Sequence, residues 1–185
     1  MPIFTVPKPN TTVRRVIFDD TTNNELNMVH LGIQLPSPIE RVQFLSDARY
    51  ISSIDLGSFF TMIRLAPEIR DFWCYQGGSH GRLRTSRMVQ GNSESPAIAQ
   101  AFIEHVFADV WRLKGKLLLY IDNIYLKATT SDLDEHLRDL GYLVKALSRY
   151  NLLINVSKSV FAATKDVVIL GMLWNSDSEW RVPDL

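Results

Sequence analysis

Short apolar runs separated by polar turn residues dominate this chain, and longer helical patterns interrupt them. Apolar runs of about four to eight residues, rich in β-branched and aromatic side chains and bounded by polar residues, are typical of strands. On this basis we predict strands at residues 3–7, 13–18, 50–56, 117–121, 124–126, 152–155 and 167–173. Residues 72–89 also predict strand structure, broken by a turn at Gly77-Gly78-Ser79.

Three segments carry helix signals. Ser37-Pro38-Ile39-Glu40 combines a capping serine, a proline at the first helical position and a capping-box glutamate, which predicts a helix to about Ser46. Ser95-Pro96 begins a second helix that ends near Lys114-Gly115-Lys116, with its apolar face at Ile98, Phe102, Val106 and Val110. Ser131-Asp132 begins a third, with an apolar stripe at Leu133, Leu137, Leu140, Val144 and Leu147.

The order of these elements predicts the fold class. A strand hairpin, a helix, a strand pair, a helix, a second hairpin, a helix and further strands follow one another along 185 residues. Two long helices beside mainly antiparallel strands give an α+β fold, in which an antiparallel sheet packs on the helices. The length suits a single domain with a sizeable core.

Charge and cysteine content narrow the function classes. The chain has 20 Lys and Arg against 20 Asp and Glu, which argues against a generally basic, DNA-coating protein but allows a local basic groove. The single cysteine, Cys74, cannot form an internal disulfide, so we expect an intracellular setting, nuclear or cytoplasmic. No apolar run approaches the roughly 20 residues of a membrane span, so we expect no membrane partner.

Two aspartates follow apolar strands and are candidate site residues. Asp122 and Asn123 stand between the apolar runs at 117–121 and 124–126, so we predict a hairpin with an Asp-Asn turn and Asp122 at its tip. Asp55 ends the apolar run that starts at Tyr50. Either aspartate alone is most simply a turn former. Together they could hold a divalent cation if the fold brings them close.

Six motifs in order carry a family resemblance. From about Ile3 to about Trp174 the chain resembles the fingers and palm of reverse transcriptases (RNA-directed DNA polymerases) from retroviruses and gypsy-like long-terminal-repeat retrotransposons. The motifs are Val6-Pro7-Lys8-Pro9-Asn10 with Arg14; Ser53-Ile54-Asp55-Leu56 with Phe60; Val89-Gln90-Gly91 with Ser95-Pro96-Ala97-Ile98-Ala99-Gln100; Tyr120-Ile121-Asp122-Asn123; Asn155 to Lys158; and Leu170-Gly171.

The resemblance implies a division of the chain. We expect one reverse-transcriptase-like domain over 1–185, with β-rich fingers at about residues 1–48 and 61–90. The palm then takes about residues 49–60 and 91–185. We recognise no thumb or RNase H segment in this chain.

The resemblance also implies roles for individual residues. The catalytic group is Asp55, Asp122, Asn123 and Lys158, with Lys158 a candidate proton donor to the leaving pyrophosphate. Two Mg²⁺ ions would be held by Asp55, Asp122 and the backbone carbonyl of Leu56. The nucleotide-binding group is Lys8 and Arg14 on the triphosphate, Phe60 under the sugar, and Gln90, Gly91 and Tyr120.

One departure from the family pattern affects the expected activity. The catalytic hairpin of the family ordinarily ends in two aspartates, whereas here the second is Asn123. An amide keeps an oxygen donor but loses the charge, so the hold on metal should weaken. The Arg that usually follows the first fingers strand is also missing, because the chain reads Phe18-Asp19-Asp20.

Two hypotheses follow. In the first, the chain is a polymerase core that uses two Mg²⁺ ions, dNTP and an RNA or DNA template-primer, with activity weakened or lost through Asn123. In the second, it is a catalytically inactive, domesticated reverse-transcriptase fold that binds no Mg²⁺ and serves as a structural or nucleic-acid- or protein-binding subunit of a larger assembly. Primer extension would separate them.

Overall fold

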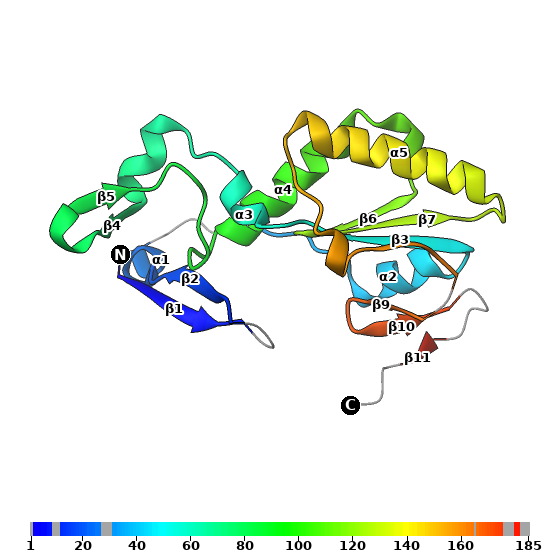
Figure 1. Ribbon diagram of the computed structural model, residues 1–185, viewed down its shortest axis with the longest axis horizontal. Coiled ribbons are helices and arrows are strands. Elements are labelled where there is room, and N and C mark those ends of the chain that lie inside the picture. Colours follow the sequence, from blue (N-terminus) through cyan, green and yellow to red (C-terminus); the bar gives the residue numbers. More distant parts are fainter. Residues whose placement is uncertain (1, 9–11, 27–30, 165, 176–179, 182–185) are drawn as a thin grey trace. The chain divides into compact units, whose positions relative to one another are not determined.

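The computed structural model describes residues 2–8, 12–26, 31–164, 166–175 and 180–181 (Figure 1). The chain divides into two compact units. The first comprises Met1–Ile33 and Ser58–Ala99, and the second comprises Gln34–Gly57 and Gln100–Leu185. The expected finger and palm boundaries remain predictions.

Short strands and helical turns make up the first unit. β1 (Ile3–Pro7) and β2 (Arg14–Phe18) form the predicted antiparallel hairpin, and its turn residues 9–11 lie outside the described residues. β4 (Cys74–Gln76) and β5 (Arg82–Arg84) form a second hairpin, as the glycine turn predicts. The other elements are α1 (Thr21–Leu26), α3 (Phe59–Met62), 3₁₀ helices at Pro67–Phe72 and Gly78–His80, and the start of α4 (Ser95–Ala108).

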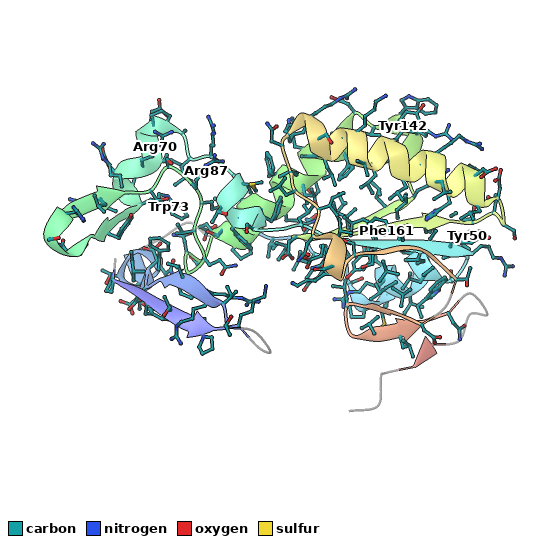
Figure 2. All side chains as sticks on the ribbon, viewed as in Figure 1. Tyr50, Arg70, Trp73, Arg87, Tyr142 and Phe161 are labelled. Atoms are coloured by element: carbon teal, nitrogen blue, oxygen red, sulfur yellow. The ribbon has the colours of Figure 1, made fainter. Side chains whose placement is uncertain are left out.

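Arginine side chains fasten backbone segments within this unit. Arg70 Nε donates to the carbonyl of Leu65 at 3.0 Å, and Arg87 Nη1 donates to the carbonyl of Met62 at 2.8 Å. Figure 2 labels both arginines. These bonds satisfy the carbonyl of Leu65, which lies in an irregular segment, and that of Met62, the last residue of α3, which has no following helical turn to pair with.

A four-stranded antiparallel sheet is the centre of the second unit. Its strand order is β6–β7–β3–β8, with bounds Leu117–Tyr120, Asn123–Ala128, Tyr50–Asp55 and Val160–Ala163. Helix α5 (Leu133–Arg149) covers one face (Figure 1). The other face is covered by α2 (Pro38–Leu45) and by a small sheet of β9 (Val167–Ile169), β10 (Met172–Trp174) and β11 (Trp180–Arg181). The predicted α+β class is confirmed.

Helix α2 begins where its capping signature predicts. The Ser37 hydroxyl accepts from the Glu40 N–H at 3.3 Å, and the Glu40 carboxylate accepts from the Ser37 N–H at 2.7 Å. One core cluster packs α2 and the four-stranded sheet against the small sheet. Its buried members are Leu45, Ala48, Ile51, Leu118, Tyr125, Val167, Ile169 and Trp174.

The predicted apolar face of α5 is wrong. Leu147 is fully buried, but Leu133, Leu137 and Val144 are 42%, 46% and 38% exposed. The buried side is His136, Asp139, Leu143, Ala146 and Leu147. Two polar side chains can lie there because each has partners: His136 bonds Ser52, and Asp139 pairs with cations.

Cations around Asp139 connect α5 to the 3₁₀ turn at Trp111–Leu113. Arg112 Nε and Lys116 Nζ donate to the two Asp139 oxygens at 2.6 and 2.5 Å. The Arg112 guanidinium also lies 5.2 Å from the ring centroid of Tyr142, which Figure 2 labels on α5. The hydrogen bond from Lys116 to Asp139 raises the pKa of that lysine above its ordinary value. This network rotates α5 away from the orientation that its leucines predict.

Helix α4 also differs from its prediction. It ends at Ala108 rather than near Lys114, and its buried residues are Ser95, Ala99, Gln100, Ile103, Val106 and Phe107. The buried side is therefore turned by about one residue from the predicted face, and it includes the polar Gln100.

Within the described residues, no helix combines the length and the apolar character needed to span a bilayer.

Candidate active site

The end of β3 places Asp55. The strand forms because Ile51 and Ile54 are fully buried on its two faces, while Asp55 is half-buried at its end. Two bonds from a later segment fix the Asp55 backbone: its N–H donates to Ser159 Oγ at 3.1 Å, and its carbonyl accepts from the Asn155 N–H at 2.8 Å. The motif from Asn155 to Lys158 thus lies beside Asp55, although 100 residues separate them in sequence.

The β6–β7 hairpin places Asp122 in its turn, as predicted, but the turn itself is one residue earlier than expected. Asn123 is not a turn residue; it pairs with Tyr120 as the first residue of β7. Ile121 and Asp122 make the turn, and Ile121 takes a φ of 55°. The ladder to β3 explains the shift, because Asn123 is also paired with Asp55.

The structure brings positions 55 and 122 together. Asp55 lies directly opposite Asn123 in the antiparallel register, and the Leu56 N–H donates to the Asp122 carbonyl at 2.9 Å. Side chains directly opposite in such a ladder share a face, with Cβ atoms about 4.5–5.5 Å apart. Tyr120 belongs to the same row, because it pairs with Asn123. The two aspartates therefore belong to adjacent ends of neighbouring strands.

Both carboxylates have partners within the chain. Asn123 Nδ2 donates to Asp122 Oδ1 at 2.9 Å. Lys158 Nζ lies 3.5 Å from Asp55 Oδ2, with the two side chains 47% and 19% exposed. A long ion pair that involves a half-exposed lysine contributes little to stability.

The pKa of Tyr125 reflects its burial and the charges nearby. Burial is the main cause that raises it to about 12; the negative charges of Asp122 and Asp55 also raise it, while a backbone hydrogen bond with Leu170 and the positive charge of Arg41 lower it. The hydroxyl is therefore protonated at physiological pH. Arg41 also lies over the Tyr120 ring, 5.6 Å from its centroid, which places a cation beside the hairpin.

The oxygen donors of this site fit Mg²⁺. Among the described residues, no three His, Cys, Asp or Glu side chains converge on one point. Mg²⁺ does not require such a cluster, since it commonly takes one or two carboxylates and completes its shell with phosphate and water. Asp55 and Asp122 would supply the carboxylates. The Leu56 N–H donates to the Asp122 carbonyl. The neighbouring β-bridge between Leu56 and Ile154 is formed by the Gly57 N–H and the Asp55 carbonyl, so it does not use the Leu56 carbonyl.

The other predicted site residues belong to the first unit. Arg14 Nε donates to Thr5 Oγ1 at 2.7 Å and its Nη2 to the Thr5 carbonyl at 2.8 Å, so the guanidinium is bonded across the hairpin. The Lys8 N–H donates to the Val13 carbonyl at 3.0 Å, which continues this hairpin. Phe60 is half-buried in α3 and makes an edge contact with Phe59.

Gln90 and Gly91 pack against β2. The Gln90 side chain is exposed, and its carbonyl accepts from the Phe18 N–H at 3.1 Å. Gly91 has a φ of 121°, and a Cβ there would lie 1.9 Å from the Phe18 carbonyl oxygen. This contact within the first unit is by itself sufficient reason for glycine at position 91.

Sequence reasoning missed Gln100, Arg41 and Ser159 as neighbours of the site. Gln100 forms a hydrogen bond to the β6–β7 hairpin, Arg41 faces Tyr120, and Ser159 Oγ accepts from the Asp55 N–H. The only available signal was for Gln100, which ends the Ser95–Gln100 motif. Nothing in the local pattern distinguishes Arg41 or Ser159 from surface residues.

Known proteins resemble this chain in sequence and in fold. Residues 6–173 match the family described as "Reverse transcriptase (RNA-dependent DNA polymerase)". The chain is also similar to the "Retrovirus-related Pol polyprotein from transposon opus" of Drosophila melanogaster, at 28% identity over 174 residues. That alignment covers 92% of this chain and 16% of the polyprotein.

Solved structures share the fold. A foamy viral protease-reverse transcriptase in complex with double-stranded DNA is similar with a TM-score of 0.80 and 24% identity, covering 95% of this chain and 29% of that one. The same kind of enzyme in complex with an RNA/DNA hybrid is similar with a TM-score of 0.73 and 24% identity, over 92% and 22% of the two chains. The chain thus spans less than a third of the length of these relatives. The family match over residues 6–173 shows that this chain belongs to the reverse transcriptase (RNA-dependent DNA polymerase) family, of the retroelement type.

Proposed function

We propose that this chain is a polymerase core that extends a primer on an RNA or DNA template by nucleotidyl transfer. The observation that carries the proposal is the meeting of Asp55 and Asp122 at the ends of adjacent strands, joined by the bond from Leu56 N–H to the Asp122 carbonyl. A transition state rich in negative charge needs cations there, and two carboxylates at one place favour cation binding.

Three groups of the second unit would hold Mg²⁺: the carboxylates of Asp55 and Asp122 and the carbonyl of Leu56. Two divalent ions would stabilise the attacking primer oxygen and the leaving pyrophosphate oxygen. Lys158 would protonate the leaving pyrophosphate; its ammonium is already next to Asp55 and is half-exposed, so it can turn toward a phosphate. Tyr120, in the same row as Asn123, would contact the nucleotide or primer end.

Residues of the first unit would bind the incoming nucleotide. Lys8 and Arg14 would hold the triphosphate, where a guanidinium fork suits phosphate oxygens. Arg14 would exchange its two bonds to Thr5 for bonds to phosphate. Phe60 would lie against the sugar, and Gln90 would contact the nucleotide with its exposed amide.

Asn123 sets how tightly metal is held. Its amide donates to Asp122 Oδ1, an oxygen that would otherwise be available to a cation. The site also has one negative charge fewer than an Asp-Asp hairpin. Both effects should weaken Mg²⁺ binding relative to an Asp at position 123.

A second candidate function has its own supporting observation. Asp122 is bonded to Asn123, and Asp55 is paired with Lys158, so both carboxylates have partners within the chain without a metal ion. A palm of this kind would persist as an inactive subunit that binds protein or nucleic acid in an intracellular assembly. This candidate predicts no primer extension and no Mg²⁺-dependent increase in stability.

Primer extension with two variants separates these functions. We expect Asn123→Asp to increase Mg²⁺-dependent extension on RNA or DNA templates, and Asp55→Ala to abolish it. Asn151→Asp is the matched control, since it adds the same charge at an exposed position just after α5 that is not one of the proposed site residues. Extension by neither the wild-type chain nor Asn123→Asp, with either Mg²⁺ or Mn²⁺, would contradict the polymerase proposal and favour the inactive subunit.

A further inference from the structure

A buried glutamine on α4 forms hydrogen bonds with the backbone of the hairpin that carries Asp122. The Gln100 side chain is only 4% exposed. Its Oε1 accepts from the Ile121 N–H at 2.8 Å, and its Nε2 donates to the Leu119 carbonyl at 3.2 Å. One amide thus bonds the backbone on either side of Tyr120, directly before Asp122.

A second residue determines which way this amide faces. Gln100 Nε2 also donates to Glu104 Oε1 at 2.8 Å, one helical turn further along α4. If the amide were reversed, its carbonyl oxygen would face the Glu104 carboxylate and the Leu119 carbonyl, and its NH₂ would face the Ile121 N–H. Every one of these contacts would be repulsive, so Glu104 and the two backbone groups specify a single orientation.

These hydrogen bonds hold a turn whose backbone is strained. Ile121 has a φ of 55°, a conformation that β-branched residues rarely adopt because Cβ approaches the backbone. Such a conformation persists only where the surroundings enforce it. Here the enforcement comes from two sides: Gln100 bonds Ile121, and Leu56 N–H bonds the Asp122 carbonyl at 2.9 Å.

We infer that Gln100, oriented by Glu104, is a positioning residue that sets the turn conformation and thereby aims the Asp122 carboxylate. The inference deepens the proposed function, because it concerns how the same site holds its metal. Gln100 itself touches neither metal nor nucleotide. Its effect reaches Asp122 through the backbone of Leu119, Tyr120 and Ile121.

Gln100→Met tests the inference, since methionine nearly fills the same space without hydrogen bonds. Amide exchange measured by NMR should rise about tenfold at Ile121, the factor for losing a hydrogen bond of ordinary net strength, and stay unchanged at Leu118. The Asn123 side-chain amide signal, which reports its bond to Asp122, should shift. The apparent Kd for Mn²⁺ should rise about 10- to 100-fold, as for other residues that orient metal ligands.

Three further variants complete the test. Gln43→Met makes the same exchange at an exposed position of α2 and should change none of these readouts. Glu104→Gln keeps an oxygen acceptor and should change each readout less than about twofold. Glu104→Leu removes the orienting acceptor while leaving Gln100 in place, so it should raise Ile121 exchange even if Gln100→Met fails to fold.

Two results would overturn the inference: Ile121 exchange that is the same in wild type, Gln100→Met and Glu104→Leu, or an Asn123 amide signal that does not move. A wild-type chain that binds no Mn²⁺ would instead contradict the proposed function. The exchange and Asn123 measurements need no metal, so they would still decide whether Gln100 positions the turn.

Discussion

His136 makes the stability of this chain depend on pH in a direction that the structure fixes. The ring is fully buried on α5, where Nε2 shares a 2.9 Å hydrogen bond with Ser52 Oγ on β3. Ser52 Oγ also accepts from the Ala162 N–H at 2.9 Å. Nδ1 is buried without a partner among the described residues, so a proton added to the ring would have no acceptor there.

The sign of the effect follows from the pKa. Burial lowers the pKa of His136 below 6.5, an effect that the positive charge of Lys116 adds to and the negative charge of Asp139 opposes. Below about pH 6.5 the unfolded chain therefore binds a proton that the folded chain does not. Stability from this residue is present above that pH and is lost as the pH falls toward the lowered pKa.

The magnitude is bounded by one proton. A single group changes the free energy of unfolding by at most about 1.4 kcal/mol per pH unit, so the loss between about pH 6.5 and pH 5 is at most about 2 kcal/mol. Urea unfolding at a series of pH values measures it. His136→Gln removes the titration and should flatten this part of the profile, and His105→Gln, at an exposed position, is the matched control. A His136→Gln profile as steep as that of the wild type would refute the reasoning.

Three other changes have effects that the structure sets. Gly91→Ala should lower the free energy of unfolding by more than the about 1–2 kcal/mol of a left-handed alanine, because its Cβ would also lie 1.9 Å from the Phe18 carbonyl oxygen. Gly78→Ala, with φ 58° and open space, should lose only the contribution of the backbone conformation. Equal unfolding midpoints for the two variants would contradict this. Asp139→Asn should lower the free energy of unfolding by about 3–5 kcal/mol, because it leaves Arg112 and Lys116 without their buried partner. Asp71→Asn removes an exposed ion pair with Arg84 and should lower it by less than about 1 kcal/mol in the same urea titration. Ser37→Ala should cost about 1 kcal/mol through loss of the α2 cap, with Ser46→Ala as a comparison at the other end of the helix, and an unchanged thermal midpoint would argue against the capping box.

Local chemistry was enough to predict several of the elements and that each of the two aspartates follows a strand. The capping box at Ser37, the glycine turn at Gly77 and the apolar run before Asp55 each act over a few residues, so the sequence alone places them. The order of the motifs along the chain likewise indicates the family without reference to the tertiary structure. Such signals do not depend on what the segment later packs against.

Tertiary structure decided the rest, because it depends on partners that are distant in sequence. The hairpin turn is Ile121-Asp122 rather than Asp122-Asn123, since pairing with Asp55 draws Asn123 into the ladder. The buried side of α5 contains His136 and Asp139 rather than its leucine stripe, since Ser52, Arg112 and Lys116 satisfy their polar groups. A hydrophobic pattern indicates which apolar side chains are buried, but only the folded chain determines which polar groups can be buried with them.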